Sequence, residues 1–304
     1  MGSVDRYAGA RQLVSMGEER GRTEVLRYEY CATSTPETEG FYTDGMNKSF
    51  LRTGIAIAAF LAFGGRTQAQ TLTWDNVHIN VTDPARAAEW YVKYLGAKLV
   101  GAPGQGTQAM FGDVVLVFLK GQEPQTSAGS LIDHISVSFA DPDSRMKEIE
   151  AGGGKVLAPL RDLPGLFKAG FVEDPFGIKI EVVQDPERLG FHHVHLSVPN
   201  PATTLKWYHD MFGGEQARLK GRLDGLRYGG VWLLAENNGG KTSNPKGSIQ
   251  YIGLRMADVR ESAAALQAKG VKFTTEPRAL RNLWYAIAED CDGSRVEMIQ
   301  RSQP

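Results

Sequence analysis

The sequence has few cysteines, no excess of charge and no long apolar segment, and each shortage excludes a class of protein. Only Cys31 and Cys291 are cysteines among 304 residues, which excludes a disulfide-rich scaffold. Lys and Arg number 34 against 35 Asp and Glu, and no basic run occurs, so we expect no nucleic-acid partner. The remaining composition is that of a globular protein of about two domains.

The main apolar stretch, residues 54–63, is shorter than the roughly 20 residues that cross a bilayer. A cationic segment that begins at Met46 precedes it and the small residues Thr67-Gln-Ala69 follow it, an order typical of a secretory signal peptide. We therefore expect a signal peptide over 46–69, a periplasmic or secreted protein and no stable membrane span after cleavage. An uncleaved anchor is the alternative. Residues 1–45 are interpreted as a non-native or disordered extension.

The second part of the chain repeats the first. Asn76-Val-His-Ile-Asn-Val-Thr-Asp-Pro84 recurs 117 residues later as His193-Val-His-Leu-Ser-Val-Pro-Asn-Pro201. The stretch Glu173–Glu181 recurs as Glu289–Glu297, 116 residues later. A nearly constant offset over such distant segments indicates a duplication. It predicts one domain over 70–188 and a second over 189–304.

Each copy divides into two similar units, each with the pattern of a strand, a helix and about three further strands. The first strands begin near Val77, His134, Val194 and Tyr251. The helices are expected to begin after residues whose side chains accept backbone N–H groups and to stop near a glycine. Those N-caps are Asp83, Asp141, Asn200 and Asp258. We therefore predict an α+β fold of two tandem domains, each formed by two consecutive units.

The first copy contains three side chains suited to binding a metal ion: His78, His134 and Glu181. Because strand residues alternate between faces, His78 and His134 point away from the apolar residues that pack against the helices. Two imidazoles and one carboxylate suit a divalent first-row ion and leave coordination positions open. Taken singly, each residue is better explained by an ordinary structural role, a hydrogen-bonded core or rim residue for each histidine and a solvated strand charge for Glu181.

These residues and the Asp174-Pro-Phe-Gly177 turn before Glu181 resemble the vicinal oxygen chelate superfamily, which includes glyoxalase I, extradiol dioxygenases and bleomycin-resistance proteins. The resemblance covers about residues 74 to 301. It implies two βαβββ units that close a cup-shaped mixed sheet around a metal ion, with ligands from the first strand of each unit and the last strand of the second unit. His78, His134 and Glu181 fall on those positions, so we expect them to converge in the N-terminal cup.

The second copy departs from the pattern because Tyr251 stands where the second histidine is expected, between His195 and Glu297. A neutral phenol is a poor ligand for most divalent ions. We therefore interpret His195, Tyr251 and Glu297 as a degenerate second site. His192 and His193, which flank the same strand, are interpreted as surface or interface residues.

The resemblance implies a small-molecule substrate with adjacent oxygen atoms and a divalent ion, which the sequence leaves open as Fe, Mn, Zn or Ni. Dioxygenase-like chemistry is favoured, because a glyoxalase-like isomerase or lyase also uses a carboxylate at a position that aligns with Leu116 and Leu233. A non-catalytic binding protein of the resistance type is the third alternative. The chain is expected to be a monomer or a homodimer. Candidate substrate contacts are Arg161, Phe167, Lys168 and Phe171.

Overall fold

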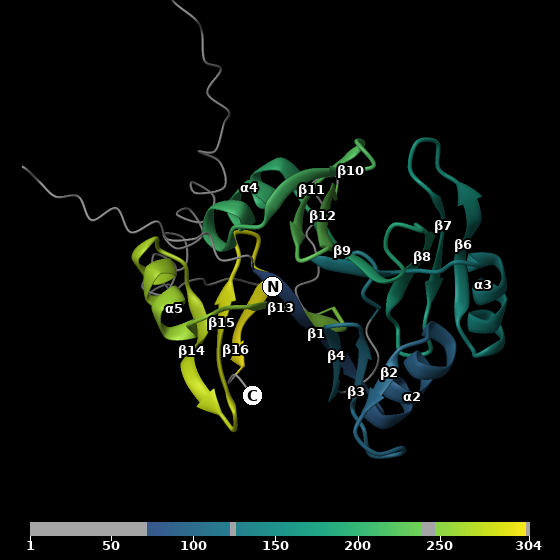
Figure 1. Ribbon diagram of the computed structural model, residues 1–304, viewed down its shortest axis with the longest axis horizontal. Helices are drawn as coiled ribbons and strands as arrows, with labels where there is room; N and C mark the ends of the chain where they lie inside the picture. The colour runs from purple at the N-terminus through teal and green to yellow at the C-terminus, as the bar shows by residue number, and fades with distance from the viewer. Residues whose placement is uncertain (1–71, 122–125, 239–246, 302–304) are drawn as a thin grey trace, which may run out of the picture.

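The computed structural model describes residues 72–121, 126–238 and 247–301, which form four βαβββ units (Figure 1). Unit 1 comprises β1 (Thr73–Val81), α2 (Pro84–Leu95), β2 (Lys98–Val100), β3 (Gln108–Phe111) and β4 (Val114–Lys120). Unit 2 comprises β5 (Ile132–Ser138), α3 (Pro142–Ala151), β6 (Lys155–Asp162), β7 (Lys168–Glu173) and β8 (Lys179–Gln184).

The second copy repeats this order of elements. Unit 3 comprises β9 (Gly190–Val198), α4 (Pro201–Phe212), β10 (Glu215–Leu219), β11 (Leu223–Tyr228) and β12 (Val231–Asn237). Unit 4 comprises β13 (Ile249–Arg255), α5 (Val259–Ala268), β14 (Phe273–Leu280), β15 (Leu283–Glu289) and β16 (Arg295–Arg301). The predicted α+β class and the duplication are confirmed.

The helices begin where the sequence predicts, because the expected side chains accept hydrogen bonds from free backbone N–H groups. Asp83 accepts from Arg86, Asp141 from Ser144 and Asn200 from Thr203, while Asp258 accepts from both Arg260 and Glu261. Helix α2 ends at Gly96, whose φ of 74° lies in the left-handed region that glycine adopts without strain.

The four units combine into two mixed sheets of eight strands, but not in consecutive pairs. One sheet, here the 1–4 sheet, has the order β14-β15-β16-β13-β1-β4-β3-β2 and contains units 1 and 4. The other, the 2–3 sheet, has the order β10-β11-β12-β9-β5-β8-β7-β6. Figure 1 shows the exchange by colour, since the blue strands of unit 1 continue into the yellow strands of unit 4. The expectation that consecutive units share one cup is therefore wrong.

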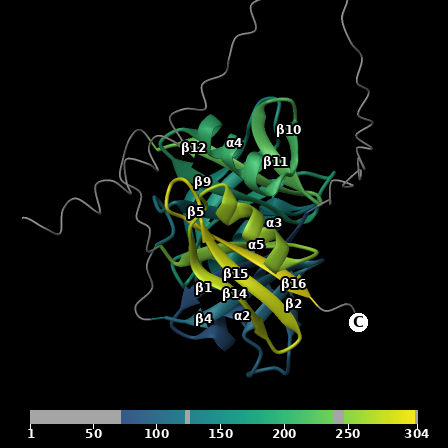
Figure 2. The same cartoon turned by 90° about the vertical axis from the view of Figure 1, so that its left-hand side faces the viewer.

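Two antiparallel strand pairs join the units within these sheets. Strand β1 pairs with β13, with His78 opposite Tyr251, and β5 pairs with β9, with His134 opposite His195. Figure 2 shows the teal and green units above the blue and yellow ones. Apolar side chains on the helix-facing side of all four central strands, among them Val77, Ile135, Val194 and Ile252, belong to one continuous core.

Within each copy, a hydrogen bond between a helix and a turn also joins the two units. The Tyr91 hydroxyl on α2 donates a 2.8 Å hydrogen bond to the buried carboxylate of Asp174, in the turn between β7 and β8. Tyr208 on α4 makes the same bond, also 2.8 Å, to Asp290 between β15 and β16. Each bond links a helix of one unit to a turn of the following unit, so consecutive units are joined through their helices and turns.

The predicted signal peptide, the extension before it and Cys31 lie outside the described residues. Within the described ranges, none of the helices has both the length and the apolar character needed to cross a membrane.

Candidate metal centre

The 2–3 sheet brings three histidines together on the face away from the helices. His134 lies on β5, and His193 and His195 lie on β9, where residues two apart share a face. One ring nitrogen from each residue lies within 4.8 Å of the corresponding nitrogens of the other two. His134 and His193 are buried, whereas His195 is half-buried and borders a pocket of about 420 Å³.

Glu181 completes this cluster from strand β8, which runs parallel to β5. Its Oε2 atom lies 2.9 Å from Nε2 of His193 and 3.7 Å from Nε2 of His134. Both imidazole nitrogens are buried and lack a hydrogen-bond partner among the described residues. A buried polar atom without a partner is costly, so two such atoms facing one carboxylate fit a cluster that holds a cation.

Asp133 determines which nitrogen of His134 faces the cluster. Its Oδ1 atom lies 2.7 Å from Nδ1 of His134, and the side chain of Lys179 and the backbone N–H of Gly129 hold the carboxylate in place. When Nδ1 donates to this carboxylate, Nε2 carries the free lone pair that a metal ion requires. The Phe171 ring packs edge-on against His134, with ring centres 5.3 Å apart, and fixes its orientation further.

The protonation states of the cluster follow from burial and from the neighbouring charged groups. Burial would raise the pKa of Glu181, but the neighbouring His134 and His193 outweigh it and hold that pKa well below its ordinary value. Burial lowers the pKa of His193, and burial together with the neighbouring imidazoles lowers that of His195 strongly. Asp133 and Glu181 outweigh burial at His134 and raise its pKa, so a metal ion competes with a proton for that imidazole. The carboxylate of Glu181 and the imidazoles of His193 and His195 are therefore in their ligating forms.

His78 does not join His134 and Glu181, because β1 pairs with β13 rather than with β5. The residue opposite His134 is His195, which the sequence assigned to the degenerate site. His193 is buried within the cluster, and His192 is buried beside it, so the surface interpretation of both is wrong. The alternation of His193 with His195 on one strand was the available signal for His193.

The 1–4 sheet contains the corresponding positions with different side chains. His78, Glu297, Tyr251 and Asn76 stand where the 2–3 sheet has His195, Glu181, His134 and His193, at offsets of 116 or 117 residues. His78 Nε2 lies 3.5 Å from Glu297, whose carboxylate already accepts a 2.7 Å hydrogen bond from Asn76. Tyr251 stacks on His78, and burial raises its pKa, so the phenol stays neutral. Among the described residues, this sheet holds no group comparable to the three histidines.

The proposed substrate contacts lie at different distances from the cluster. Phe171 contacts His134, and Phe167 contacts the ring of His192, with centres 5.5 Å apart. Lys168 donates to Asp143 in the first turn of α3, and Arg161 is exposed. The structure thus brings Phe171 to the histidine cluster and Phe167 to the neighbouring His192, while the amine of Lys168 is already paired elsewhere.

Comparisons with known proteins agree with this architecture. The structure of glyoxalase I from Zea mays superposes with a TM-score of 0.62 at 22% identity, covering 75% of this chain and 92% of that chain. A "putative dioxygenase" from Bacillus subtilis superposes with a TM-score of 0.56 at 16% identity, covering 77% and 86%. Identities this low show a shared fold only.

Sequence comparison gives the family directly. No curated protein sequence matches this chain. The Glyoxalase/Bleomycin resistance protein/Dioxygenase superfamily, however, matches residues 73–182 and again residues 190–298. These two segments are the repeats found in the sequence, and the chain therefore belongs to this superfamily as a tandem two-domain member.

Proposed function

We propose that this protein is a metal-dependent enzyme that acts on a small molecule with adjacent oxygen atoms, with dioxygenase-like chemistry. The supporting observation is the buried cluster in which unpartnered ring nitrogens of His134 and His193 face the carboxylate of Glu181. We assign His134, His195 and Glu181 as the ligands. Two imidazoles and a carboxylate hold Fe, Mn, Zn or Ni as a Lewis acid and leave positions open for a chelating substrate.

The surrounding residues orient this site and control access to it. Asp133 holds His134 in the tautomer that directs Nε2 inward. His193 Nε2, beside Glu181, is placed to accept a proton from a bound substrate, because burial keeps its imidazole neutral. The pocket beside His195 also has Leu223 and Leu234 in its wall, so a small substrate reaches the cluster from this side.

A glyoxalase-like isomerase or lyase is the second candidate, and the strand register favours it at one position. Glu181 on β8 pairs with Ser136, two residues after His134, and Glu236 on β12 pairs with Ser197, two residues after His195. The second carboxylate of such an isomerase therefore corresponds to Glu236. The sequence alignment with Leu233 is wrong, since Leu233 pairs with Val194 on the core face. Glu236 is exposed, whereas Glu181 is only 7% exposed. Because of this difference in burial, we rank dioxygenase-like chemistry ahead of the isomerase.

The assignment is tested by measuring bound metal in four variants of the full chain. We expect His134→Ala, His195→Ala and Glu181→Gln each to lose the metal ion. His78→Ala is the matched control, because His78 occupies the corresponding position of the other sheet, and it should retain the ion. Loss of metal in the control, or retention in all four variants, would contradict the ligand assignment.

The reaction type is tested on the metal-loaded protein. Iron content with oxygen uptake on catechol supports the dioxygenase. Nickel or zinc, with turnover of methylglyoxal and glutathione and no oxygen uptake, supports the isomerase. Less than about a tenth of an ion per chain favours a non-catalytic binding protein, because a preformed site of three ligands retains its metal.

A further inference from the structure

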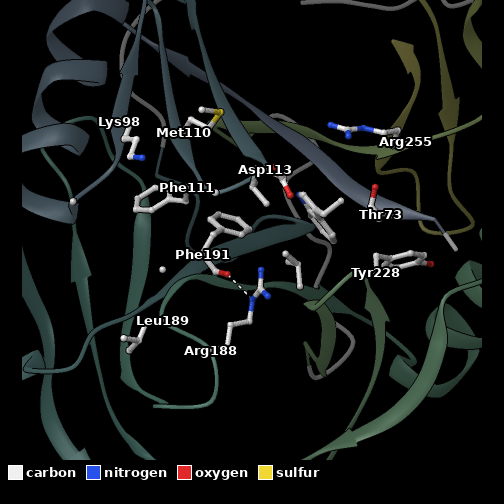
Figure 3. A pocket seen from close by; sticks show the side chains of 17 residues that line it. Thr73, Lys98, Met110, Phe111, Asp113, Arg188, Leu189, Phe191, Tyr228 and Arg255 are labelled. Atoms are coloured by element: carbon white, nitrogen blue, oxygen red, sulfur yellow. Dashed lines mark hydrogen bonds between the residues drawn. The ribbon is translucent and has the colours of Figure 1, made fainter. Parts of the chain in front are cut away.

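A separate pocket of about 530 Å³ lies where units 1 and 3 meet (Figure 3). Its walls come from the start of β1, the turn between β3 and β4, residues 188–191, the turn between β11 and β12, and the end of β13. None of the histidine cluster lines this pocket. Its volume is sufficient for a ligand of metabolite size.

The apolar walls of this pocket repeat across the duplication. Trp74 corresponds to Phe191 and Phe111 to Tyr228, each pair 117 residues apart. These rings contact one another, with centres 6.4 Å apart for Trp74 and Phe191 and 6.2 Å apart for Phe111 and Phe191. An aromatic surface formed equally by both copies offers a flat apolar body extensive contact.

The charged residues break this symmetry. The pocket is lined by Lys98, Arg188 and Arg255 but by only one carboxylate, that of Asp113. Figure 3 shows the three cations on different sides of the pocket, with Phe111 and Phe191 between them. Arg255 shares the buried carboxylate of Asp75 with Arg301, so that carboxylate neutralises only one of the two guanidinium groups.

Arg188 is the cation with the least compensation. Its Nε atom donates to the carbonyl of Phe191 at 2.9 Å, and no carboxylate of the described residues lies within ion-pair distance. Burial without a compensating anion lowers the pKa of Arg188. The terminal nitrogens Nη1 and Nη2 of Arg188 remain available to a ligand. Gly230 leaves room for Nη1, because a Cβ at position 230 would lie 2.5 Å from that atom.

The pocket wall also contains an unsatisfied donor. Trp74 is only 2% exposed, and its indole N–H has no acceptor among the described residues. Buried donors are nearly always paired in folded proteins. An unpaired N–H and an uncompensated guanidinium in one pocket both require acceptor atoms.

We propose that this pocket binds a small aromatic carboxylate, whose carboxylate pairs with Arg188 and whose ring packs against Phe111 and Phe191. Guanidinium groups bind carboxylates through two parallel hydrogen bonds, which gives both strength and orientation. The site is independent of the metal centre and of the proposed reaction. It gives the interface between the copies a binding role of its own.

Calorimetric titration of the full chain with 2-naphthoate and neutral 2-naphthamide tests the proposal. EDTA is present throughout, so that the carboxylate cannot bind through a metal ion. We expect naphthoate to bind at least about tenfold more tightly than the amide, since a charge-assisted pair is lost in the amide. Equal affinities, or no naphthoate binding in the presence of EDTA, would overturn the proposal.

Arg188→Gln should abolish the preference for naphthoate, while Arg86→Gln, which removes an exposed guanidinium on α2, should leave it unchanged. If Arg188→Gln lowers the melting temperature, Lys98→Gln replaces it, because Lys98 is exposed on a short strand. That variant should weaken naphthoate binding several-fold without affecting the amide. A preference that persists in both variants contradicts the proposal.

Discussion

Two residue exchanges distinguish the sheet face that carries the histidine cluster from the corresponding face of the other sheet. The 2–3 sheet has His134 and His193 where the 1–4 sheet has Tyr251 and Asn76, although the remaining histidine and glutamate are the same in both. Tyr251 removes a ligand because its buried phenol stays neutral. Asn76 removes the second buried imidazole and occupies the carboxylate of Glu297 with a donated hydrogen bond. One pair of substitutions thus removes the histidine cluster while the fold is retained.

At the same scale, Asp133→Asn should weaken metal binding by about 10- to 100-fold, because an amide no longer fixes the orientation and basicity of His134. Lys179→Gln is the matched control, since Lys179 contacts the same carboxylate but not the histidine. Titration with zinc against a competing chelator measures the effect. Equal losses in both variants would show that Asp133 acts only through its ion pair with Lys179.

The elements are joined by the two Tyr–Asp hydrogen bonds, and Tyr91→Phe tests their contribution. The change leaves the buried Asp174 carboxyl without one of its donors, which we expect to lower the unfolding free energy by about 1–3 kcal/mol. Tyr208→Phe should have a similar effect at Asp290. Tyr285→Phe, at an exposed hydroxyl that accepts from Arg278, should cost less than about 0.5 kcal/mol. Urea unfolding that ranks all three variants alike would contradict this assignment.

The same two turns make stability depend on pH. Burial raises the pKa of Asp174 to about 7 and that of Asp290 to about 6, against roughly 3.9 in the unfolded chain. The folded state therefore retains protons that the unfolded state releases, so these groups stabilise the protein fully only below about pH 4. Their contribution falls as the pH rises towards 7 and is constant above it.

Asp174→Asn stays neutral at every pH, so the loss of unfolding free energy between pH 4.5 and 7 should be smaller in this variant than in the original protein. The difference should be on the order of a few kcal/mol at most, from 1.36 kcal/mol per pKa unit. Asp113→Asn, at an exposed position, should leave the pH dependence unchanged. If urea unfolding gives the same dependence of unfolding free energy on pH for the original protein and for Asp174→Asn, Asp174 does not titrate in the folded protein as proposed.

Local patterns in the sequence predict the helices and strands, whereas the pairing of strands depends on contacts between distant segments. The caps at Asp83 and Asp141 identify the starts of two helices correctly, and the alternation around His78 identifies the first strand and its faces. The four units carry the same pattern of apolar strand residues, so the edge of β1 is equally suited to β5 or β13. Nothing in residues 73–81 distinguishes these partners, and the choice decides whether His78 or His195 lies opposite His134. His193 was missed although it alternates with His195 on β9, because its counterpart in the first copy is Asn76 and the repeat therefore did not mark the position.

At the scale of the whole molecule, each sheet is completed across the boundary between the copies. Residues 70–188 alone would lack β13 and β9, the partners of β1 and β5, and residues 189–304 would lack β1 and β5 in turn. Each copy would therefore expose two unpaired strand edges with adjacent apolar surface. The copies are repeats in sequence but are not independent in structure.

Residues 70–188 and 189–304, produced separately, should therefore not form stable monomers, and mixing them should restore a folded complex. The metal centre gives a specific readout, because His134 and Glu181 belong to the first fragment and His195 to the second. We expect metal binding in the mixture to be lost with His195→Ala in the second fragment and kept with His78→Ala in the first. Size-exclusion chromatography with metal analysis checks both points. A first fragment that is monomeric and binds metal as tightly as the full chain would contradict the exchanged pairing, because His195 would then be unnecessary.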